Sequence, residues 1–503
     1  MPPSPGRLTP LLCVGLASAC VVDPELARRG WLHDTLIRDN QVFLERSPEL
    51  VAGKFAKMAL GSYDYFRGSA SQYGRDATEA GSPGYRAMAY LDEDAWDVAL
   101  VGDPHPENLG TFLDLEGRVR VEFNDFDAAT YGPWPLDVRR LALGFDAACR
   151  HVLELQADAE TTPSESLVES DCLRWAEAAT RGYVEQIAIV GVDPSAGVEL
   201  REGEPELGVI VDELLADARE DGDAGSRLTD HTEIVADQRR FRLGAIEPPL
   251  TVAIAGFEVE IQQDTLVEAS DADRELIDGL LSRYAETLEG PSDAHPLVLL
   301  DLARRLGAGV SSYAVPRYYL LFEGPSEAHD DDLLLEAKQL LDPLSLPGIP
   351  RNPALTWPDN GTRVISLQRA LQAPGSDRWL GHATVGGMAI GVRHRSGYQR
   401  GFAVDRMSER LAEGDWTRAD VEQFAGLAGA LLAHAHARAS KADGTLGGPA
   451  IARALADDRE GFVRETLAFV ADYGPRTAKD RQLLIELIAA HGLTLDYGSG
   501  IAP

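Results

Sequence analysis

The sequence predicts a mixed α+β chain with a helical C-terminal part, on two observations. Between about residues 24 and 60, and again from Trp416 to the end, apolar residues recur every three or four positions, which is typical of helices that bury one face. Between these regions, short apolar runs bounded by turn residues predict strands. At 503 residues the chain is long enough for a large core and for about two to four folding units.

The first half of the chain predicts a hairpin between helices. An aromatic cluster, Tyr63–Gly68, ends in a turn, and Trp96–Val101 is a short apolar strand. Two further strands, 111–115 and 118–123, are joined by Glu116 and Gly117, which are typical of a hairpin turn. Pro135 begins a helix that runs to about Leu153, because proline is well suited to the first helical turn.

The second half alternates between acidic, β-rich and helical stretches. Residues 156–230 predict acidic helices with loops, and a helix is expected at about 272–288. Strands are predicted at 250–254, 257–261, within 307–335, near 363–367 and at 389–393.

The charge of the chain excludes some partners. Asp and Glu number 81 against 47 Lys and Arg, which gives a formal net charge of −34. Binding to nucleic acid depends on clustered cations, and no Lys/Arg-rich run is present in the sequence. We therefore expect no nucleic-acid partner.

The N-terminus resembles an export signal. Arg7 precedes an apolar stretch, Leu8–Ala19, and small residues lead to Cys20 in the manner of a bacterial lipobox. We expect residues 1–20 to be a lipoprotein signal, with Cys20 lipidated and the protein anchored in the cell envelope, its sole contact with a membrane. The alternative is a disordered tail on a cytoplasmic protein. If the protein is exported, Cys149 and Cys172 are the cysteines that remain besides Cys20. They form one disulfide or stay as two buried thiols.

The stretch from Gly102 to Arg140 carries the chemistry. Asp103 follows a strand, on a loop that Pro104 and Pro106 stiffen, and Asn108 lies five residues further on. The predicted hairpin then returns the chain so that Asp125 emerges beside them. Phosphoryl transfer needs a carboxylate to accept or orient the acceptor proton and oxygen ligands for Mg²⁺, which carboxylates and amides supply. The spacing therefore predicts a metal-ready acidic site for nucleotide phosphates.

These residues resemble two known groups. Gly-Asp-x-His-x-x-Asn, a hairpin, Asp-Phe-Asp and Asp-x-x-Arg are similar to the catalytic core of aminoglycoside phosphotransferases and choline kinases, in the protein-kinase-like superfamily. More closely, the whole chain after the signal resembles the uncharacterised bacterial family DUF2252. The matching pieces are Phe66–Gly68, Gly102–Gly110, Asn124–Asp127, Gly132–Trp134, Asp137, Arg140, Gly307–Ser312, Glu336–Lys338, Gln368, Gln372 and His434–Arg438.

The kinase resemblance implies roles for the central residues. Asp103 would be the catalytic base, with Asn108 and Asp125 as magnesium ligands. Asp127 would be a further metal ligand or a solvated loop acid.

Other residues would support the loop. Asp137 would brace it, together with Arg140, and His105 would hydrogen-bond within it.

A nucleotide site also needs a glycine turn and a cation, and both follow the acidic loop in sequence. Gly307, Gly309 and Ser311 form a turn before a strand at 318–322, and the next strand, 333–337, ends at Lys338. Backbone N–H groups at such a turn can approach phosphate. This order predicts a circularly permuted or rearranged kinase-like fold. The alternative is that Arg67 supplies the phosphate-binding cation and Lys338 is only a strand-end lysine.

The permuted order divides the chain into five segments. After the signal come an acidic-loop segment (21–160), an acidic helical and strand segment (161–290), a β-rich nucleotide-lobe-like segment (291–400) and a helical segment (401–503). Arg304, Arg305 and Arg393 are conceivable phosphate ligands, but surface salt bridges are the preferred interpretation. A separation above about 10 Å between Lys338 and Asp125 would reject the permuted order.

The leading functional hypothesis is a Mg²⁺-dependent phosphotransferase or nucleotidyl transferase. It would use ATP or another nucleotide on a small hydroxyl acceptor that the sequence does not identify. The alternatives are a non-catalytic ligand-binding protein and a structural envelope lipoprotein. Asp103, Asn108 and Asp125 are all present, which argues against a catalytic site that has lost its residues. An exported location, however, conflicts with ATP as the phosphate donor. The oligomeric state is not determined by the sequence.

Overall fold

The structure is a computed structural model that describes residues 23–91, 95–159, 163–205, 207–289, 297–326, 328–343, 345–349, 355–373, 375 and 377–497. The predicted signal with Cys20 lies outside these residues. The chain is a mixed α+β protein with a helical C-terminal part, as predicted. No helix within the described ranges is long and apolar enough to cross a membrane.

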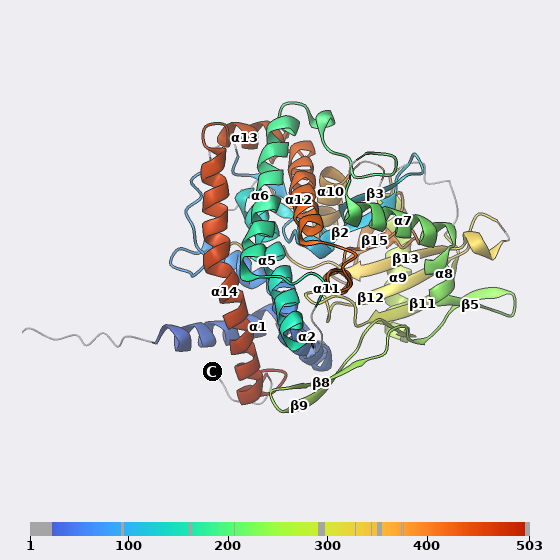
Figure 1. Cartoon of the computed structure of the whole chain (residues 1–503). Coiled ribbons are helices and arrows are strands. Elements are labelled where there is room, and N and C mark those ends of the chain that lie inside the picture. Colours follow the sequence, from blue (N-terminus) through green and yellow to red (C-terminus); the bar gives the residue numbers. More distant parts are fainter. Residues whose placement is uncertain are drawn as a thin grey trace, which may run out of the picture.

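Four long helices gather on one side of the molecule (Figure 1). They are α5 (Pro135–Asp158), α6 (Glu169–Val190), α12 (Arg418–Arg438) and α14 (Arg459–His491). Helices α5 and α6 pack against each other, and a disulfide between Cys149 and Cys172 joins them, which resolves the two alternatives for these cysteines. The shorter helices are α11 (Val404–Glu413) and α13 (Gly447–Ala454), near the long ones, and α7 (Val209–Asp223) and α8 (Ser226–His231), which lie on the sheet side (Figure 1).

A seven-stranded antiparallel sheet forms the other side (Figure 1). Its spatial order is β14-β15-β13-β12-β11-β10-β7. The strands are β7 (Gly244–Ala245), β10 (Thr265–Glu268), β11 (Leu299–Leu306), β12 (Arg317–Phe322), β13 (Leu333–Gln339), β14 (Gly381–Val385) and β15 (Met388–His394). One face is apolar and packs on α9 (Asp271–Tyr284) through Ile277 and Leu280. The opposite face carries most of the charged side chains described below.

Four two-stranded pairs accompany the sheet. They are β1 (Val98–Leu100) with β4 (Thr130–Gly132), β2 (Leu109–Leu113) with β3 (Val119–Phe123), β5 (Thr232–Val235) with β6 (Gln238–Phe241), and β8 (Leu250–Ile254) with β9 (Phe257–Ile261). The last pair has the predicted bounds, and β2 and β3 form the predicted hairpin.

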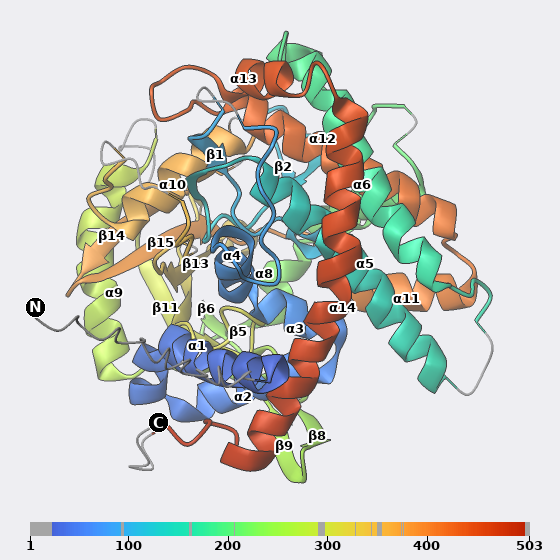
Figure 2. The ribbon, with the colours of Figure 1, turned by 90° about the vertical axis from the view of Figure 1, so that its left-hand side faces the viewer.

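The N-terminal part consists of four helices rather than one long helix. They are α1 (Pro24–Arg46), α2 (Pro48–Leu60), α3 (Ser62–Gly68) and α4 (Ala70–Thr78), and Figure 2 shows α1 and α2 crossing the lower part of α14. The break follows from Pro48, which begins α2 and lacks the N–H that would continue α1. The aromatic cluster at 63–68, expected to end in a turn, is instead the helix α3.

The strand predicted near residues 363–367 is wrong. These residues lie in α10 (Asn360–Leu371), whose first turn is capped by Asp359, with its carboxylate 2.7 Å from the N–H of Thr362. A short apolar run such as Val364–Leu367 fits a strand or a helix equally well by periodicity, and here the cap and the buried spacing from Val364 to Leu371 decide for the helix.

Candidate functional site

One cavity of about 470 Å³ brings together the acidic loop and the charged face of the sheet. The two regions are more than 160 positions apart in the chain, yet both contribute its walls. The predicted site residues that line it are Arg67, Asp103, His105, Asn108, Asp125, Asp127, Gly307, Gly309, Ser311 and Lys338.

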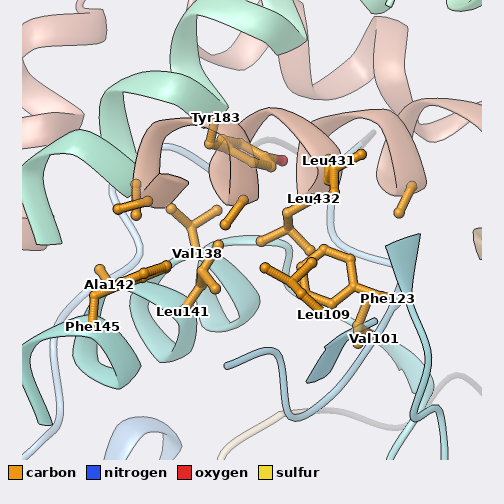
Figure 3. Close-up of a cluster of buried hydrophobic side chains, with 14 of the residues drawn as sticks. Val101, Leu109, Phe123, Val138, Leu141, Ala142, Phe145, Tyr183, Leu431 and Leu432 are labelled. Atoms are coloured by element: carbon orange, nitrogen blue, oxygen red, sulfur yellow. The ribbon is translucent and has the colours of Figure 1, made fainter. Parts of the chain in front are cut away.

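The acidic loop is anchored in the main hydrophobic core. Val101, Leu109 and Phe123 flank the loop and the hairpin, and all three are buried against α5 and α12 (Figure 3). Because close-packed side chains allow little displacement, this packing holds the polar residues between them in place. The loop closes with one turn of 3-10 helix, Pro106–Asn108.

Asp137, in the first turn of α5, holds the start of the loop. Its carboxylate accepts hydrogen bonds from the N–H groups of Val101, at 2.7 Å, and Gly102, at 3.1 Å. His436 on α12 lies 3.1 Å from the same carboxylate, and its other ring nitrogen lies 2.9 Å from the Tyr183 hydroxyl. The position of Asp137 therefore matches the bracing role implied by the kinase resemblance.

Only glycine fits at position 102. Its φ is +90°, and a Cβ there would lie 2.2 Å from the carbonyl oxygen of Ala128. The chain can turn from β1 into the loop only with a residue that lacks a side chain.

Asp103 is held by an arginine. The Arg140 Nε donates to the Asp103 carboxylate at 2.7 Å, and a second nitrogen of Arg140 donates to the Phe66 carbonyl at 2.8 Å. Burial raises the pKa of Asp103, although Arg140 opposes the shift. The carboxylate is thus oriented and more basic than usual.

Asn108 and Asp125 approach the same part of the cavity. The amide nitrogen of Asn108 donates to the Asp103 carbonyl at 2.7 Å, and the carbonyl of Asn108 accepts from the N–H of Asn124 at 2.9 Å. These bonds join the loop to the end of β3, directly before Asp125. With its nitrogen engaged, Asn108 is left with an amide oxygen as its free polar atom.

Lys338 reaches the acidic loop from the sheet. Its Nζ lies 4.0 Å from the Asp125 carboxylate and forms an ion pair with Asp127. Burial alone would raise the pKa of Asp125, but Lys338 and then Arg393 lower it to about 2. The separation is far below the limit of about 10 Å at which one nucleotide could no longer bridge the two groups.

The pKa of Asp127 is shifted in the opposite direction from that of Asp125. Burial and the charge of Asp125 raise its pKa, and its carboxylate is engaged by Lys338. One carboxylate oxygen of Asp127 thus pairs with Lys338, while the side chain is still 35% exposed.

The glycine turn joins β11 to β12 at the edge of the cavity. Gly307 and Gly309 both have φ near +80°. A Cβ on Gly307 would lie 1.8 Å from the carbonyl of Gln263, so the close approach of two backbones requires glycine there.

His105 and Arg67 take positions that the sequence did not predict. The ring of His105 contacts the Tyr63 hydroxyl on α3, at 3.4 Å, rather than a group within its own loop, and burial holds its pKa well below the usual value. Arg67 forms an ion pair with Glu107. It lines the cavity but its charge is already partnered.

The sheet contributes arginines that share a buried acid, which the sequence did not reveal. Arg305 and Arg393, interpreted as surface salt-bridge residues, instead pair with Glu336, which is fully buried, at 2.9 Å and 2.7 Å. Arg317 lies 3.5 Å from the same carboxylate. Burial alone would raise the pKa of Glu336, yet the guanidiniums hold it well below its usual range. Arginines within or beside apolar strands were the available signal, but such a pattern does not distinguish a solvated face from a cavity.

The cavity differs in charge from the rest of the protein. Seven Lys and Arg side chains and six Asp and Glu side chains line it, whereas the whole chain carries a net charge of −34. Cations concentrated in a concave site within an acidic protein favour an anionic ligand.

The acidic residues do not form a metal site of several ligands. No group of three or more His, Cys, Asp or Glu side chains in the described part of the chain is arranged to hold a metal ion. Mg²⁺, however, is commonly bound through one or two carboxylates together with substrate phosphates and water. Asp125 and the amide oxygen of Asn108 are oxygen donors of that kind.

Comparison with known proteins identifies the family. The model of a family described as an uncharacterised protein conserved in bacteria, DUF2252, matches residues 46–487, and the chain therefore belongs to that family. No curated protein and no solved structure matches the chain significantly.

Proposed function

We propose that this member of the DUF2252 family is a Mg²⁺-dependent phosphotransferase, or nucleotidyl transferase, acting on a small hydroxyl acceptor. The observation that carries the proposal is the 4.0 Å approach of Lys338 to Asp125, in a cavity that also holds Asp103, Asn108 and the glycine turn. Base, metal ligands and phosphate-binding groups are the parts that phosphoryl transfer requires.

The donor residues fit Mg²⁺. Asp125 stays ionised over the physiological range because its pKa is about 2, and Asn108 presents an amide oxygen. Both are hard oxygen ligands. A bound Mg²⁺ would neutralise charge on the phosphates of ATP or another nucleotide.

The remaining residues of the chain orient the reactants. Backbone N–H groups of the turn at Gly307 and Gly309 would bind a phosphate, and Lys338 would supply a positive charge beside it. Asp103, oriented by Arg140 and with a raised pKa, would take the proton from the acceptor hydroxyl as the new bond to phosphorus forms.

The order of these parts supports a permuted kinase-like fold. In this chain the acidic loop precedes β11, the glycine turn, β12 and β13 with Lys338, whereas ordinary kinases place the glycine turn and the lysine before the catalytic loop. The spatial approach of the two segments makes the order in sequence irrelevant to the chemistry.

Export to the cell envelope, with lipidation at Cys20, remains part of the proposal. The disulfide between Cys149 and Cys172 supports it, because such bonds persist in oxidising compartments and are rare in the cytosol. A phosphate donor other than ATP would suit that location.

A non-catalytic ligand-binding function is the second candidate, and one observation favours it. The ion pair between Asp127 and Lys338 occupies the lysine that would hold a phosphate. A ligand must break this pair, so the site would bind weakly unless the ligand offers a stronger anion.

The experiment is a thermal-stability titration of residues 21–503, with Mg²⁺ and ATP or GTP. A ligand present at 100 times its dissociation constant should add about 2.7 kcal/mol. The matched variant Asp125→Asn keeps the shape but removes a metal-binding charge, and we expect it to lose the Mg²⁺-dependent part of the shift. Absence of any shift with nucleotides would reject the phosphotransferase proposal.

A second variant separates catalysis from binding. Asp103→Asn should keep the nucleotide-dependent stabilisation and lose phosphate transfer. If Asp103→Asn retains full transfer with an acceptor found by screening, Asp103 is not the base.

A further inference from the structure

Two guanidinium groups line a side lobe next to the main cavity. Arg227, on α8, and Arg395, directly after β15, form no ion pair within the described residues. One nitrogen of Arg227 donates to the Gln399 carbonyl at 2.9 Å. The Nε of Arg395 is buried and has no hydrogen-bond partner among the described residues, and the backbone N–H of Arg395 donates to Leu334.

The acids nearest to these arginines are already engaged. Asp264 accepts two hydrogen bonds from Arg305, both at 2.7 Å. Glu336 is surrounded by Arg305, Arg317 and Arg393, as described above. The side lobe that Arg227 and Arg395 share is lined by five arginines and only three acids, Glu107, Asp125 and Asp377, which leaves an excess of positive charge.

The two arginines also repel each other. Burial, and then the charge of Arg395, lowers the pKa of Arg227 to about 10. Arg227 nevertheless remains charged at neutral pH. Like charges held in one partly buried lobe are costly unless a further group compensates them.

Arg395 lines the main cavity together with Lys338 and the glycine turn, whereas Arg227 lines only a side lobe. Arg227 and Arg395 line a side lobe of about 240 Å³, which shares Asn108 and Asp125 with the main cavity. On β13, Leu334 is four residues from Lys338, and Arg395 lies beside Leu334. At roughly 3.3 Å per residue, the two cationic positions are about 13 Å apart along the sheet.

We propose that Arg227 and Arg395 form a second anion subsite, which binds a phosphate group of the substrate at the opposite end of the cavity from Lys338. The planar guanidinium presents paired N–H donors that match the oxygens of a phosphate. The subsite adds a substrate-binding element to the proposed phosphotransferase. Assignment of the phosphate to a substrate rests on that proposed function. The phosphate belongs either to a phosphorylated hydroxyl acceptor or to the far end of the nucleotide.

Titration calorimetry of the full chain with orthophosphate tests the subsite. We expect saturable binding that weakens at least tenfold in Arg227→Gln/Arg395→Gln. The matched control is Arg400→Gln, because Arg400 lines the same lobe but is exposed and paired with Asp221 at 2.5 Å. Binding in Arg400→Gln should equal that of the unaltered chain. Each single variant, Arg227→Gln and Arg395→Gln, is measured as well, with circular dichroism to verify folding.

Three results would overturn the subsite. They are a lack of saturable phosphate binding by the unaltered chain, an equal loss in Arg400→Gln, and undiminished binding by a folded double variant. Chloride at matched ionic strength controls for screening, and equal competition by chloride would also count against a phosphate site.

The same titration identifies the source of the phosphate and separates this proposal from the preceding one. With saturating Mg²⁺ and a non-hydrolysable ATP analogue, unchanged phosphate affinity assigns the subsite to the acceptor, and competition assigns it to the nucleotide. Asp125→Asn should lose Mg²⁺-nucleotide binding and keep phosphate binding. If the unaltered chain binds phosphate through Arg227 and Arg395 but binds no nucleotide, the phosphotransferase proposal fails and the subsite stands.

Discussion

The two walls of the cavity are built in different ways. The loop wall, Val101–Arg140, takes Asp103, Asn108 and Asp125 from one continuous stretch, and its hydrogen bonds are mostly to nearby backbone. The sheet wall, defined here as the charged face of β11, β12, β13 and β15, takes its side chains from four strands and holds them through ion pairs around Glu336. Local chain geometry thus sets the first wall, and strand register sets the second.

This difference predicts that the sheet wall is the more sensitive to loss of one charge. Glu336→Gln removes the carboxylate that faces Arg305, Arg317 and Arg393 at a fully buried position. We expect a loss of about 3–5 kcal/mol in the free energy of unfolding, because buried like charges are left without compensation. Urea denaturation measures it, with Glu323→Gln, at an exposed position next to β12, as the control.

The loop wall should lose less when its central acid is neutralised. Asp137→Asn keeps one oxygen acceptor for Val101 or Gly102 and places an amide nitrogen against the other N–H. We expect a cost of about 2–3 kcal/mol by urea denaturation. A cost above that of Glu336→Gln would break the comparison and make the loop the more sensitive wall.

The glycine turn of the sheet wall, between β11 and β12, sharpens the comparison. Gly307→Ala places a Cβ against the Gln263 backbone and forces φ +80° on alanine, so we expect a loss of about 1–2 kcal/mol and weaker nucleotide binding. Gly309→Ala is the matched variant, since its Cβ would meet only the movable Ser312 hydroxyl, at 2.9 Å. Thermal unfolding of both should show the smaller loss for Gly309→Ala, and equal losses would refute the role of the backbone contact.

A pH dependence of opposite sign separates Asp377, in the side lobe, from Asp125, on the loop wall. Burial raises the pKa of Asp377, which lines the side lobe, to about 6, so the folded chain binds this proton more tightly than the unfolded chain. Its stabilising contribution is complete below about pH 4 and is lost as the pH rises to about 6, by at most about 1.4 kcal/mol per pH unit.

Asp125 behaves in the opposite sense. Its pKa is lowered to about 2, so its contribution is present above about pH 4 and is lost as the pH falls toward 2. Stability of Asp377→Asn and Asp125→Asn measured from pH 3 to pH 7 checks both signs, and a steeper rise with pH in Asp377→Asn between pH 4 and 6 is the expected result.

Much of the fold could be predicted because periodicity and turn chemistry are local. β8 and β9 begin and end where their alternating runs do, and the start of α5 at Pro135 follows from proline alone. The failure at α10 has the same origin, since the run Val364–Leu367 is too short for its period to be decided.

By itself, the sequence determined which residues could bind phosphate and metal: an acid, an amide and a second acid within 23 positions, and a glycine turn followed by a lysine. Only the tertiary structure decided that these groups share one cavity, that His436 reaches Asp137 across the chain, and that Arg305 and Arg393 pair with the buried Glu336. The physical reason is that side-chain type and spacing are properties of short segments. Burial and charge compensation depend on which strands and helices pack together, and no local pattern contains that information.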